Sequence, residues 1–171
     1  MLTREDILQE LEGEAVTTRR LLERVPEDKL DWRPHEKSFS LGQLAMHIAT
    51  LPGALAQVST LEAFQVKPNG IPRPSASSTA ELLDALDQSL AQAREIVGAM
   101  DGESLATPWK MVDGEQVLLT IPRSAFLRSV MLNHWYHHRG QLTVYLRQTG
   151  APVRAVYGPS ADETPVFSRA S

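Results

Sequence analysis

The sequence of 171 residues contains no cysteine. This absence excludes disulfide bonds, thiolate metal sites and a cysteine nucleophile, so any thiol chemistry requires a thiol from outside the chain. Basic residues are also few, with 17 lysines and arginines against 21 acidic residues and a formal net charge of −4. A protein of this charge has no general attraction to phosphate backbones, and we expect no nucleic-acid partner.

Long apolar stretches are absent as well. No window of the sequence approaches the roughly 18 apolar residues of a membrane span. Residues 1–14 carry five acidic side chains where a signal peptide would have an apolar core. We therefore expect no membrane partner and a cytoplasmic location.

The composition that remains is that of an ordinary globular protein, with 42% hydrophobic and 22% charged residues. The length lies within the usual range of one domain and allows a core that needs no disulfide or structural metal. We therefore expect residues 1–171 to form a single domain.

Four segments have apolar residues at the spacing of an amphipathic helix. Three of them begin with the capping-box pattern, a serine or threonine followed three residues later by an acidic or amide residue: Thr3 with Asp6, Ser40 with Gln43, and Ser78 with Glu81. The predicted helices cover residues 3–25, 40–61, 78–100 and 122–148. This pattern indicates an all-α fold class, specifically a four-helix bundle.

The segments between the predicted helices are rich in proline and glycine. Residues 26–39 form a connector, residues 64–78 form a linker, and residues 151–171 form a tail that lies irregularly over the bundle. The Asp113-Gly114 pair is flanked by apolar runs, which predicts a small hairpin or extended arm before the last helix.

The second predicted helix contains a proline, Pro52, about one turn after His47. A proline inside a helix lacks the amide that would bond to the carbonyl four residues earlier, here the carbonyl of Ile48. We expect a kink or bulge at this point.

Two histidines, His134 and His138, lie one helical turn apart on the predicted last helix. Their spacing places both on the face that carries Leu127 and Tyr145, which is the core face. Each neutral imidazole has a donor and an acceptor that must be satisfied away from water. The pair is therefore either part of a metal site or a hydrogen-bonded pair in the core.

Histidines four residues apart on one helix also occur in the H-E-x-x-H metalloproteases. Here the residues between them are Trp135, Tyr136 and His137, so the glutamate that would activate water is missing. This departure excludes the standard metalloprotease mechanism. A metal site requires a third ligand, and His47 is the best candidate because it lies at the edge of the second helix's apolar stripe. His35 and His137 are weaker candidates.

Several motifs resemble those of the DinB-like family of metal-binding helical bundles, also called the YfiT-like metalloenzymes. They are DWRP at 31–34, LAMHIA at 44–49, HWYHHRGQL at 134–142, LRQTG at 146–150 and YGPSAD at 157–162. The resemblance covers most of the chain. It implies a bundle with up-down-down-up connections, frequently a homodimer, in which His47, His134 and His138 bind nickel, zinc or a similar divalent ion.

Characterised members of this family include transferases and isomerases that use a low-molecular-weight thiol such as bacillithiol, mycothiol or glutathione. The resemblance therefore implies one divalent ion per chain and a metal-dependent enzyme of the small-molecule thiol transferase type. Three neutral ligands leave a position at which a water or thiol is acidified. Two alternatives stay open: a metal-dependent hydrolase, and a non-catalytic, stress-related protein that binds a metal or ligand.

Four further residues are candidates for the surroundings of the metal. Gln141 lies one turn beyond His138 on the same face, where its amide can hold a bound water. His137 suits a position behind the ligands or on the surface, and Trp32 and Tyr157 belong to segments that can roof a pocket. The alternatives are an interhelical hydrogen bond for Gln141 and ordinary packing for the two aromatic residues.

Overall fold

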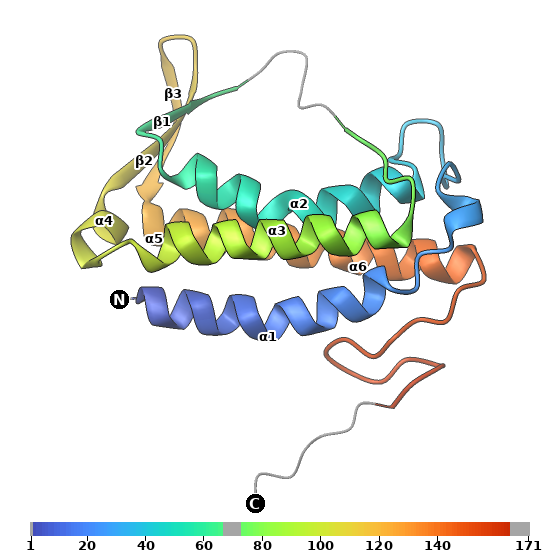
Figure 1. The fold of residues 1–171 in the computed structure, drawn as a ribbon. Helices are drawn as coiled ribbons and strands as arrows, with labels where there is room; N and C mark the ends of the chain where they lie inside the picture. Colours follow the sequence, from blue (N-terminus) through green and yellow to red (C-terminus); the bar gives the residue numbers. More distant parts are fainter. Residues whose placement is uncertain (1, 67–72, 165–171) are drawn as a thin grey trace, which may run out of the picture.

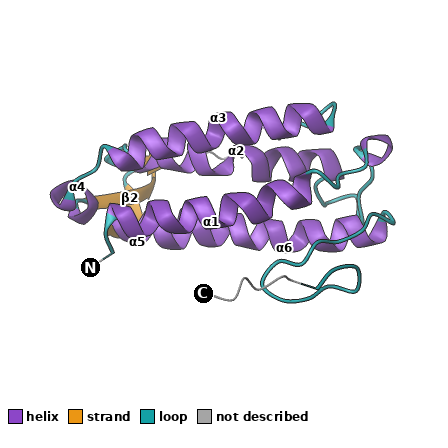
Figure 2. Cartoon of the chain, turned by 60° about the horizontal axis from the view of Figure 1, so that its bottom comes forward, coloured by secondary structure: helices purple, strands orange, loops and turns teal. Residues whose placement is uncertain are grey.

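The structure, a computed structural model, describes residues 2–66 and 73–164 and is mostly helical (Figure 1). Within these residues, four long helical segments lie side by side in both Figure 1 and Figure 2. They are α1 (Arg4–Leu22), α2 (Leu41–Ser59), α3 (Thr79–Gly98) and a last segment made of α5 (Arg123–Ala125), η2 (Phe126–Leu132) and α6 (Asn133–Gln148). In Figure 1, α1 and α6 run from left to right, whereas α2 and α3 run in the opposite direction. None of the described helices combines the length and apolarity that a membrane crossing requires.

A small three-stranded sheet within the described residues lies at one end of the long helices (Figure 1). Its strands are β1 (Ala63–Gln65), β2 (Pro108–Asp113) and β3 (Gln116–Pro122). The antiparallel pairing of β2 with β3 confirms the predicted hairpin. Its loop consists of Gly114 and Glu115, one residue later than predicted, and Gly114 has a φ of 58°, a left-handed conformation that favours glycine.

Strand β1 lies at the start of the segment that the sequence indicated as a linker, residues 64–78. It pairs in parallel with β2, so that Ala63 faces Lys110. A three-residue strand is stabilised by this distant partner and carries little local signal of its own, which explains why it was not predicted. Residues 67–72 of the predicted linker and residues 165–171 of the predicted tail lie outside the described residues.

Three helical features also differ from the predictions. Two short helices, η1 (Glu27–Lys29) and α4 (Gly102–Ala106), occur where only connecting chain was expected. The predicted last helix is not α-helical throughout, because η2 is a π-helix. A π-helix differs from an α-helix in bonding residues five apart instead of four, and the apolar spacing of a seven-residue segment is too short a pattern to reveal that difference.

Two of the predicted capping boxes are present with both of their hydrogen bonds. Thr3 Oγ1 accepts from the Asp6 amide at 3.1 Å, and the Asp6 carboxylate accepts from the Thr3 amide at 2.9 Å. Ser40 and Gln43 make the corresponding bonds at 3.2 Å and 2.9 Å. These bonds satisfy amides that have no partner within the helix, and they fix the first residues of α1 and α2.

The third predicted box is only half formed. Ser78 caps α3 by accepting from the Glu81 amide at 3.1 Å, but the Glu81 carboxylate accepts from the amide and hydroxyl of Ser77 at 2.7 Å and 2.6 Å. The helix start was therefore predicted correctly and its second bond was not. Helix α1 also ends at Leu22, three residues before the predicted end.

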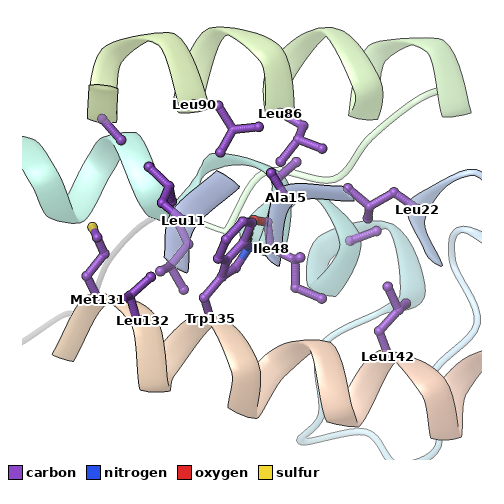
Figure 3. Close-up of a cluster of buried hydrophobic side chains, with 14 of the residues drawn as sticks. Leu11, Ala15, Leu22, Ile48, Leu86, Leu90, Met131, Leu132, Trp135 and Leu142 are labelled. Atoms are coloured by element: carbon purple, nitrogen blue, oxygen red, sulfur yellow. Dashed lines mark hydrogen bonds between the residues drawn. The ribbon is translucent and has the colours of Figure 1, made fainter. Parts of the chain in front are cut away.

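The core is formed by the apolar faces of all four long helical segments (Figure 3). In the close-up, Leu11 of α1, Ile48 of α2, Leu86 of α3 and Trp135 of α6 point toward one another. All four are fully buried. Because the histidine-bearing helices α2 and α6 meet across this core, its packing sets their separation.

Helix α2 packs closely against α3 at Gly53. A Cβ atom at this position would lie 2.8 Å from the Ser89 carbonyl oxygen, a distance that side chains do not adopt. The Gly53 amide donates to Ser89 Oγ at 2.8 Å. Glycine at position 53 therefore permits the close approach of the two helices, and Ser89 supplies a partner to the amide next to Pro52.

Pro52 leaves the carbonyl of Ile48 without its usual helical partner, yet α2 continues as helix on both sides of the proline. The indole Nε1 of Trp135 donates to this carbonyl at 2.9 Å. Both residues are fully buried, so water cannot replace the bond. The proline in α2 thus leaves a buried carbonyl without a backbone donor, and a tryptophan of α6 donates to it instead.

We predict that Trp135→Phe destabilises the protein by about 1–3 kcal/mol, because it leaves the buried Ile48 carbonyl without a donor. In a Pro52→Ala background, the new amide of residue 52 can bond to the same carbonyl. The destabilisation by Trp135→Phe should then shrink by about 1 kcal/mol. Urea unfolding of the wild type, both single variants and the double variant measures this coupling.

Trp109 provides the matched control, since its indole also donates to a carbonyl of α2, that of Val58, at 3.1 Å, and it is also fully buried. Trp109→Phe should lower the free energy of unfolding by the same amount in the wild type and in the Pro52→Ala background. Equal losses for Trp135→Phe in the two backgrounds would show that the proline does not create the acceptor.

Candidate metal centre

Three histidines meet between α2 and α6. His47 comes from α2, and His134 and His138 come from α6, one turn apart. The ring centroid of His47 lies 5.4 Å from that of His134 and 4.6 Å from that of His138. The ring centroids of His134 and His138 are 4.6 Å apart. One ring nitrogen of each histidine lies within 4.8 Å of the others. The structure therefore brings together the three residues that the sequence proposed as a metal site.

The two histidines of α6 bond to each other, and one of them bonds to Gln141. Nε2 of His134 lies 2.7 Å from Nε2 of His138, and Nδ1 of His138 lies 2.7 Å from Oε1 of Gln141. Because an amide oxygen only accepts, His138 carries its proton on Nδ1 and its Nε2 accepts from His134. His134 therefore carries its proton on Nε2 in this arrangement. Binding of a cation at this Nε2 requires the other neutral tautomer of His134, with its proton on Nδ1.

The three nitrogen donors fit a small divalent cation. Zinc binds imidazole nitrogen at about 2.0–2.1 Å, so two ligands at tetrahedral angles lie about 3.3 Å apart. The nitrogen pair of His134 and His138, at 2.7 Å, would open by about 0.6 Å, and His47 would approach the pair. Small rotations of the three rings provide these movements. The cluster can therefore hold a metal ion.

Phe39, which precedes the cap of α2, covers the cluster. Its ring stacks on His47 with centroids 5.7 Å apart and planes 18° from parallel, and it meets His138 edge-on at 6.0 Å. The Phe39 carbonyl accepts from the Tyr145 hydroxyl at 3.2 Å, and Trp32 packs edge-on against Tyr145 at 5.5 Å. Trp32 thus lies behind the site and supports Phe39 through Tyr145. The sequence predictions did not include Phe39, whose position directly before a capping serine is its only local signal.

Two of the other predicted residues lie at the edge of the site or away from it. His137 is exposed, and its ring packs beside His138 at 4.9 Å without contributing a nitrogen to the cluster. Tyr157 is 68% exposed, and its hydroxyl bonds to Glu14 and Arg139 instead of to the histidines. Gln141 is exposed but bonds to His138 directly, which places it behind the ligand.

Arg139, the residue after His138, fixes α6 against α1. It is 1% exposed, forms an ion pair with Glu14 at 2.5 Å, and donates to Thr18 Oγ1 at 3.2 Å. Its guanidinium also lies 5.1 Å from the ring centroid of Tyr136. A buried charge is tolerated when it is paired and hydrogen-bonded in this way. These contacts attach one face of α6 to α1. They thereby fix the rotation of α6 about its axis, with His134 and His138 directed toward α2.

A cavity of about 490 Å³ opens beside the histidines, with His47 and His134 in its wall. Its other walls come from α2, β1, β2 and η2, and they are mainly apolar. Arg73 lies at its edge, with the guanidinium 4.4 Å from the ring centroid of Phe39. The sequence predictions missed this cavity, because it depends on the unpredicted strand β1 and on an arginine in a segment without periodicity.

The surroundings disfavour protonation of all three histidines. Burial lowers the pKa of His47 to about 4, with further contributions from the charges of His138, His134 and Arg73. Burial also lowers the pKa of His134 to about 4, and it lowers the pKa of His138, although the bond to Gln141 opposes that shift. At neutral pH the rings are therefore uncharged, which is the form that binds a metal.

In the metal-free protein, we predict that stability falls as the pH is lowered from about 6.5 to about 4. In this window the unfolded state binds protons at these histidines and the folded state does not, so the free energy of unfolding decreases with decreasing pH. The slope of the unfolding free energy against pH gives the number of protons taken up on unfolding. His47→Gln should reduce this number by up to about one. Urea unfolding in the presence of a chelator between pH 7.5 and pH 4.5 measures this slope.

His35→Gln is the control, because His35 is exposed in the connector and lies outside the cluster. This variant should keep most of the wild-type slope. A His47→Gln slope equal to that of the wild type would show that the folded protein accepts a proton at position 47 as readily as the unfolded chain does.

Comparisons with known proteins agree over nearly the whole chain. A family model described as the DinB family matches residues 1–165. The uncharacterized protein YrdA of Bacillus subtilis (strain 168) is 27% identical over 168 residues, which cover 96% of this chain and 94% of that protein. A solved DinB-like protein from Bacillus cereus ATCC 10987 has 25% identity and a TM-score of 0.69, over 90% of this chain and 97% of the other. The DinB-like protein YjoA of B. subtilis shares the fold, with 21% identity and a TM-score of 0.65 over 88% and 96% of the two chains.

Proposed function

The chain belongs to the DinB family, and from this premise we propose that it is a metal-dependent enzyme acting on a small molecule. His47, His134 and His138 are the proposed ligands of one divalent ion per chain. The observation that carries the proposal is the convergence of three imidazoles, from two helices, beside an apolar cavity that two of them, His47 and His134, line. Neutral rings in such surroundings are best satisfied when a cation shares them. In this proposal the four long helical segments form an up-down-down-up bundle around the site.

Nickel and zinc are the proposed ions, since both accept imidazole nitrogen. When bound, such an ion supplies a Lewis acid with an open position, which lowers the pKa of a thiol or water there. The residues of the chain prepare the site for it. Gln141 holds the proton of His138 on Nδ1 and thereby leaves Nε2 free to bind, and Phe39 shields His47 from water.

The proposed reaction is the transfer of a low-molecular-weight thiol to an electrophile. The thiol sulfur forms a bond to an electrophilic carbon, the leaving group departs with the electron pair of the broken bond, and the thiol proton passes to solvent. Hydrolysis is the alternative reaction, because a bound ion that lowers the pKa of water to about 7 supplies hydroxide without a protein base, and no aspartate or glutamate lines the cavity as described. A thiol, with a pKa of about 8.5, ionises without such a base. Because a free thiol ionises more readily than free water, we propose the thiol transferase first and keep the hydrolase as the alternative.

The lack of a carboxylate among the described lining residues also supports a second candidate. This is a non-catalytic, stress-related protein whose cavity holds a ligand next to the ion. The two candidates bind metal alike and differ only in turnover. The family resemblance further predicts a homodimer, and the sequence pattern predicts a cytoplasmic location; both of these stay predictions.

We predict about one equivalent of divalent metal per chain after purification without a histidine tag. The double variant His134→Ala/His138→Ala should retain less than about a tenth of this amount, because a single remaining imidazole cannot hold the ion. Elemental analysis of the dialysed proteins gives the stoichiometry and the identity of the metal.

His35→Ala/His137→Ala is the matched control, since it also removes two histidines but neither belongs to the cluster. It should bind as much metal as the wild type. Equal metal content in the wild type and in the His134→Ala/His138→Ala variant would refute the proposed site.

Turnover separates the enzyme from the binding protein. We predict that consumption of an electrophile such as 1-chloro-2,4-dinitrobenzene, in the presence of bacillithiol, mycothiol or glutathione, is accelerated by the protein. A chelator should abolish the acceleration, and re-addition of the ion should restore it. Tight ligand binding with no acceleration by the metal-loaded protein would favour the non-catalytic candidate.

A further inference from the structure

We propose that the cavity beside the histidines selects a small organic anion, with its apolar body in the cavity and its carboxylate next to Arg73. This inference rests on the proposed function, because His47 and His134 form one part of the cavity wall. It goes further by naming the class of molecule that the site takes. The electrophile or its product would then carry one negative group and a compact apolar body.

The walls of the cavity define the apolar body of this ligand. The lining includes Leu55 and Val58 of α2, Phe64 of β1, Met111 of β2, and Phe126 and Val130 of η2. The volume of about 490 Å³ lies within the range of small-molecule sites, about 300–1,000 Å³. A set of apolar walls around this volume favours a compact hydrocarbon or aromatic group and disfavours a sugar or a phosphate-rich cofactor.

Arg73 supplies the one charged side chain of the described lining. Its guanidinium lies over the ring of Phe39, which in turn stacks on His47. The Gln43 side-chain amide donates to the Arg73 carbonyl at 3.3 Å, which attaches this residue to the first turn of α2. The arginine is therefore held beside the histidines by two contacts, a cation–π stack and a hydrogen bond.

The guanidinium has no acidic neighbour to neutralise it in the part of the chain that the structure describes. No ion pair involves Arg73 among these residues, and no aspartate or glutamate lines the described cavity. A planar guanidinium with free donors pairs well with a carboxylate. A cationic ligand would be repelled, and a neutral ligand would leave the arginine unused. The combination of charge and apolar walls therefore selects an amphipathic anion.

Three probes of equal chain length test the proposal: decanoate, decanol and decyltrimethylammonium. Isothermal titration of the metal-free and metal-loaded full-length protein, at low ionic strength, should give the tightest binding for decanoate and the weakest for the cation. Arg73→Gln should weaken decanoate binding about five- to tenfold in both forms, and it should leave decanol binding unchanged. Added salt should weaken decanoate binding to the wild type and not to the variant.

Arg33→Gln is the matched charge control, because Arg33 is also exposed and does not line the cavity. It should leave decanoate binding within about twofold of the wild type. Equal losses in the Arg33→Gln and Arg73→Gln variants would assign the effect to net charge alone and overturn the proposal. Equal binding of decanoate and decyltrimethylammonium would also overturn it.

A second pair of variants tests the apolar part. Ala54 lines the cavity from an exposed position of α2, so Ala54→Phe fills part of the cavity without disturbing the core. This variant should weaken decanoate binding at least tenfold in both the metal-free and the metal-loaded protein. Ala91→Phe, at an exposed position of α3, should have no effect. Decanoate binding that is unaffected by Ala54→Phe would place the ligand elsewhere and refute the inference.

These measurements separate this inference from the proposed function. A protein that binds decanoate through Arg73 but holds no metal supports the inference and refutes the metal-dependent enzyme. A protein that binds one metal ion and shows no Arg73-dependent preference for decanoate refutes the inference and leaves the metal site intact.

Discussion

The hydrogen bond from the Trp135 indole to the Ile48 carbonyl fixes the helix pair on which the site depends. Ile48 directly follows His47 in α2, and Trp135 directly follows His134 in α6. The bond therefore sets the register of the two helices at the positions next to His47 and His134. Pro52 makes this arrangement specific, because it removes the backbone donor that would otherwise occupy the carbonyl. Sliding α6 by one turn would leave both the carbonyl and the indole unsatisfied in the core, a loss for each group of about 1–3 kcal/mol.

A fixed register has a consequence for the three imidazoles. Without a cation between them, the ring nitrogens of His134 and His138 at 2.7 Å form a hydrogen bond between a neutral donor and a neutral acceptor. A proton added to either ring would place a positive charge beside two other rings and away from water. The core packing that holds the helices together therefore also keeps the histidines in their metal-binding form at neutral pH. Stability of the fold and readiness of the site come from the same contacts.

Local signals predicted the parts of the molecule that local contacts determine. The starts of α1, α2 and α3 follow from capping residues, and the spacing of His134 and His138 placed both on the inner face of α6. The pairing of His47 with them is a contact between distant segments, and its prediction rested on the apolar stripe of α2 and on family resemblance. Strand β1 and the position of Arg73 have no periodic pattern and depend on neighbours far away in the sequence, and the apolar periodicity of η2 does not distinguish a π-helix from an α-helix. The clustering of the three histidines was therefore predictable, and the cavity beside them was not.

This division also determines the chemistry that the site can perform. The helices contribute neutral nitrogen donors, the sheet and η2 contribute apolar walls, and the segment before α3 contributes a cation. With no carboxylate from the described lining, the charge of a bound divalent ion would remain uncompensated by the protein. In the proposed enzyme, such an ion would lower the pKa of an incoming thiol or water more than an ion with an acidic ligand, and it would attract anions into an otherwise apolar space. In the proposed enzyme, the lack of a carboxylate in the described lining would therefore leave a metal-activated thiol or hydroxide as the nucleophile, without a base from the cavity wall.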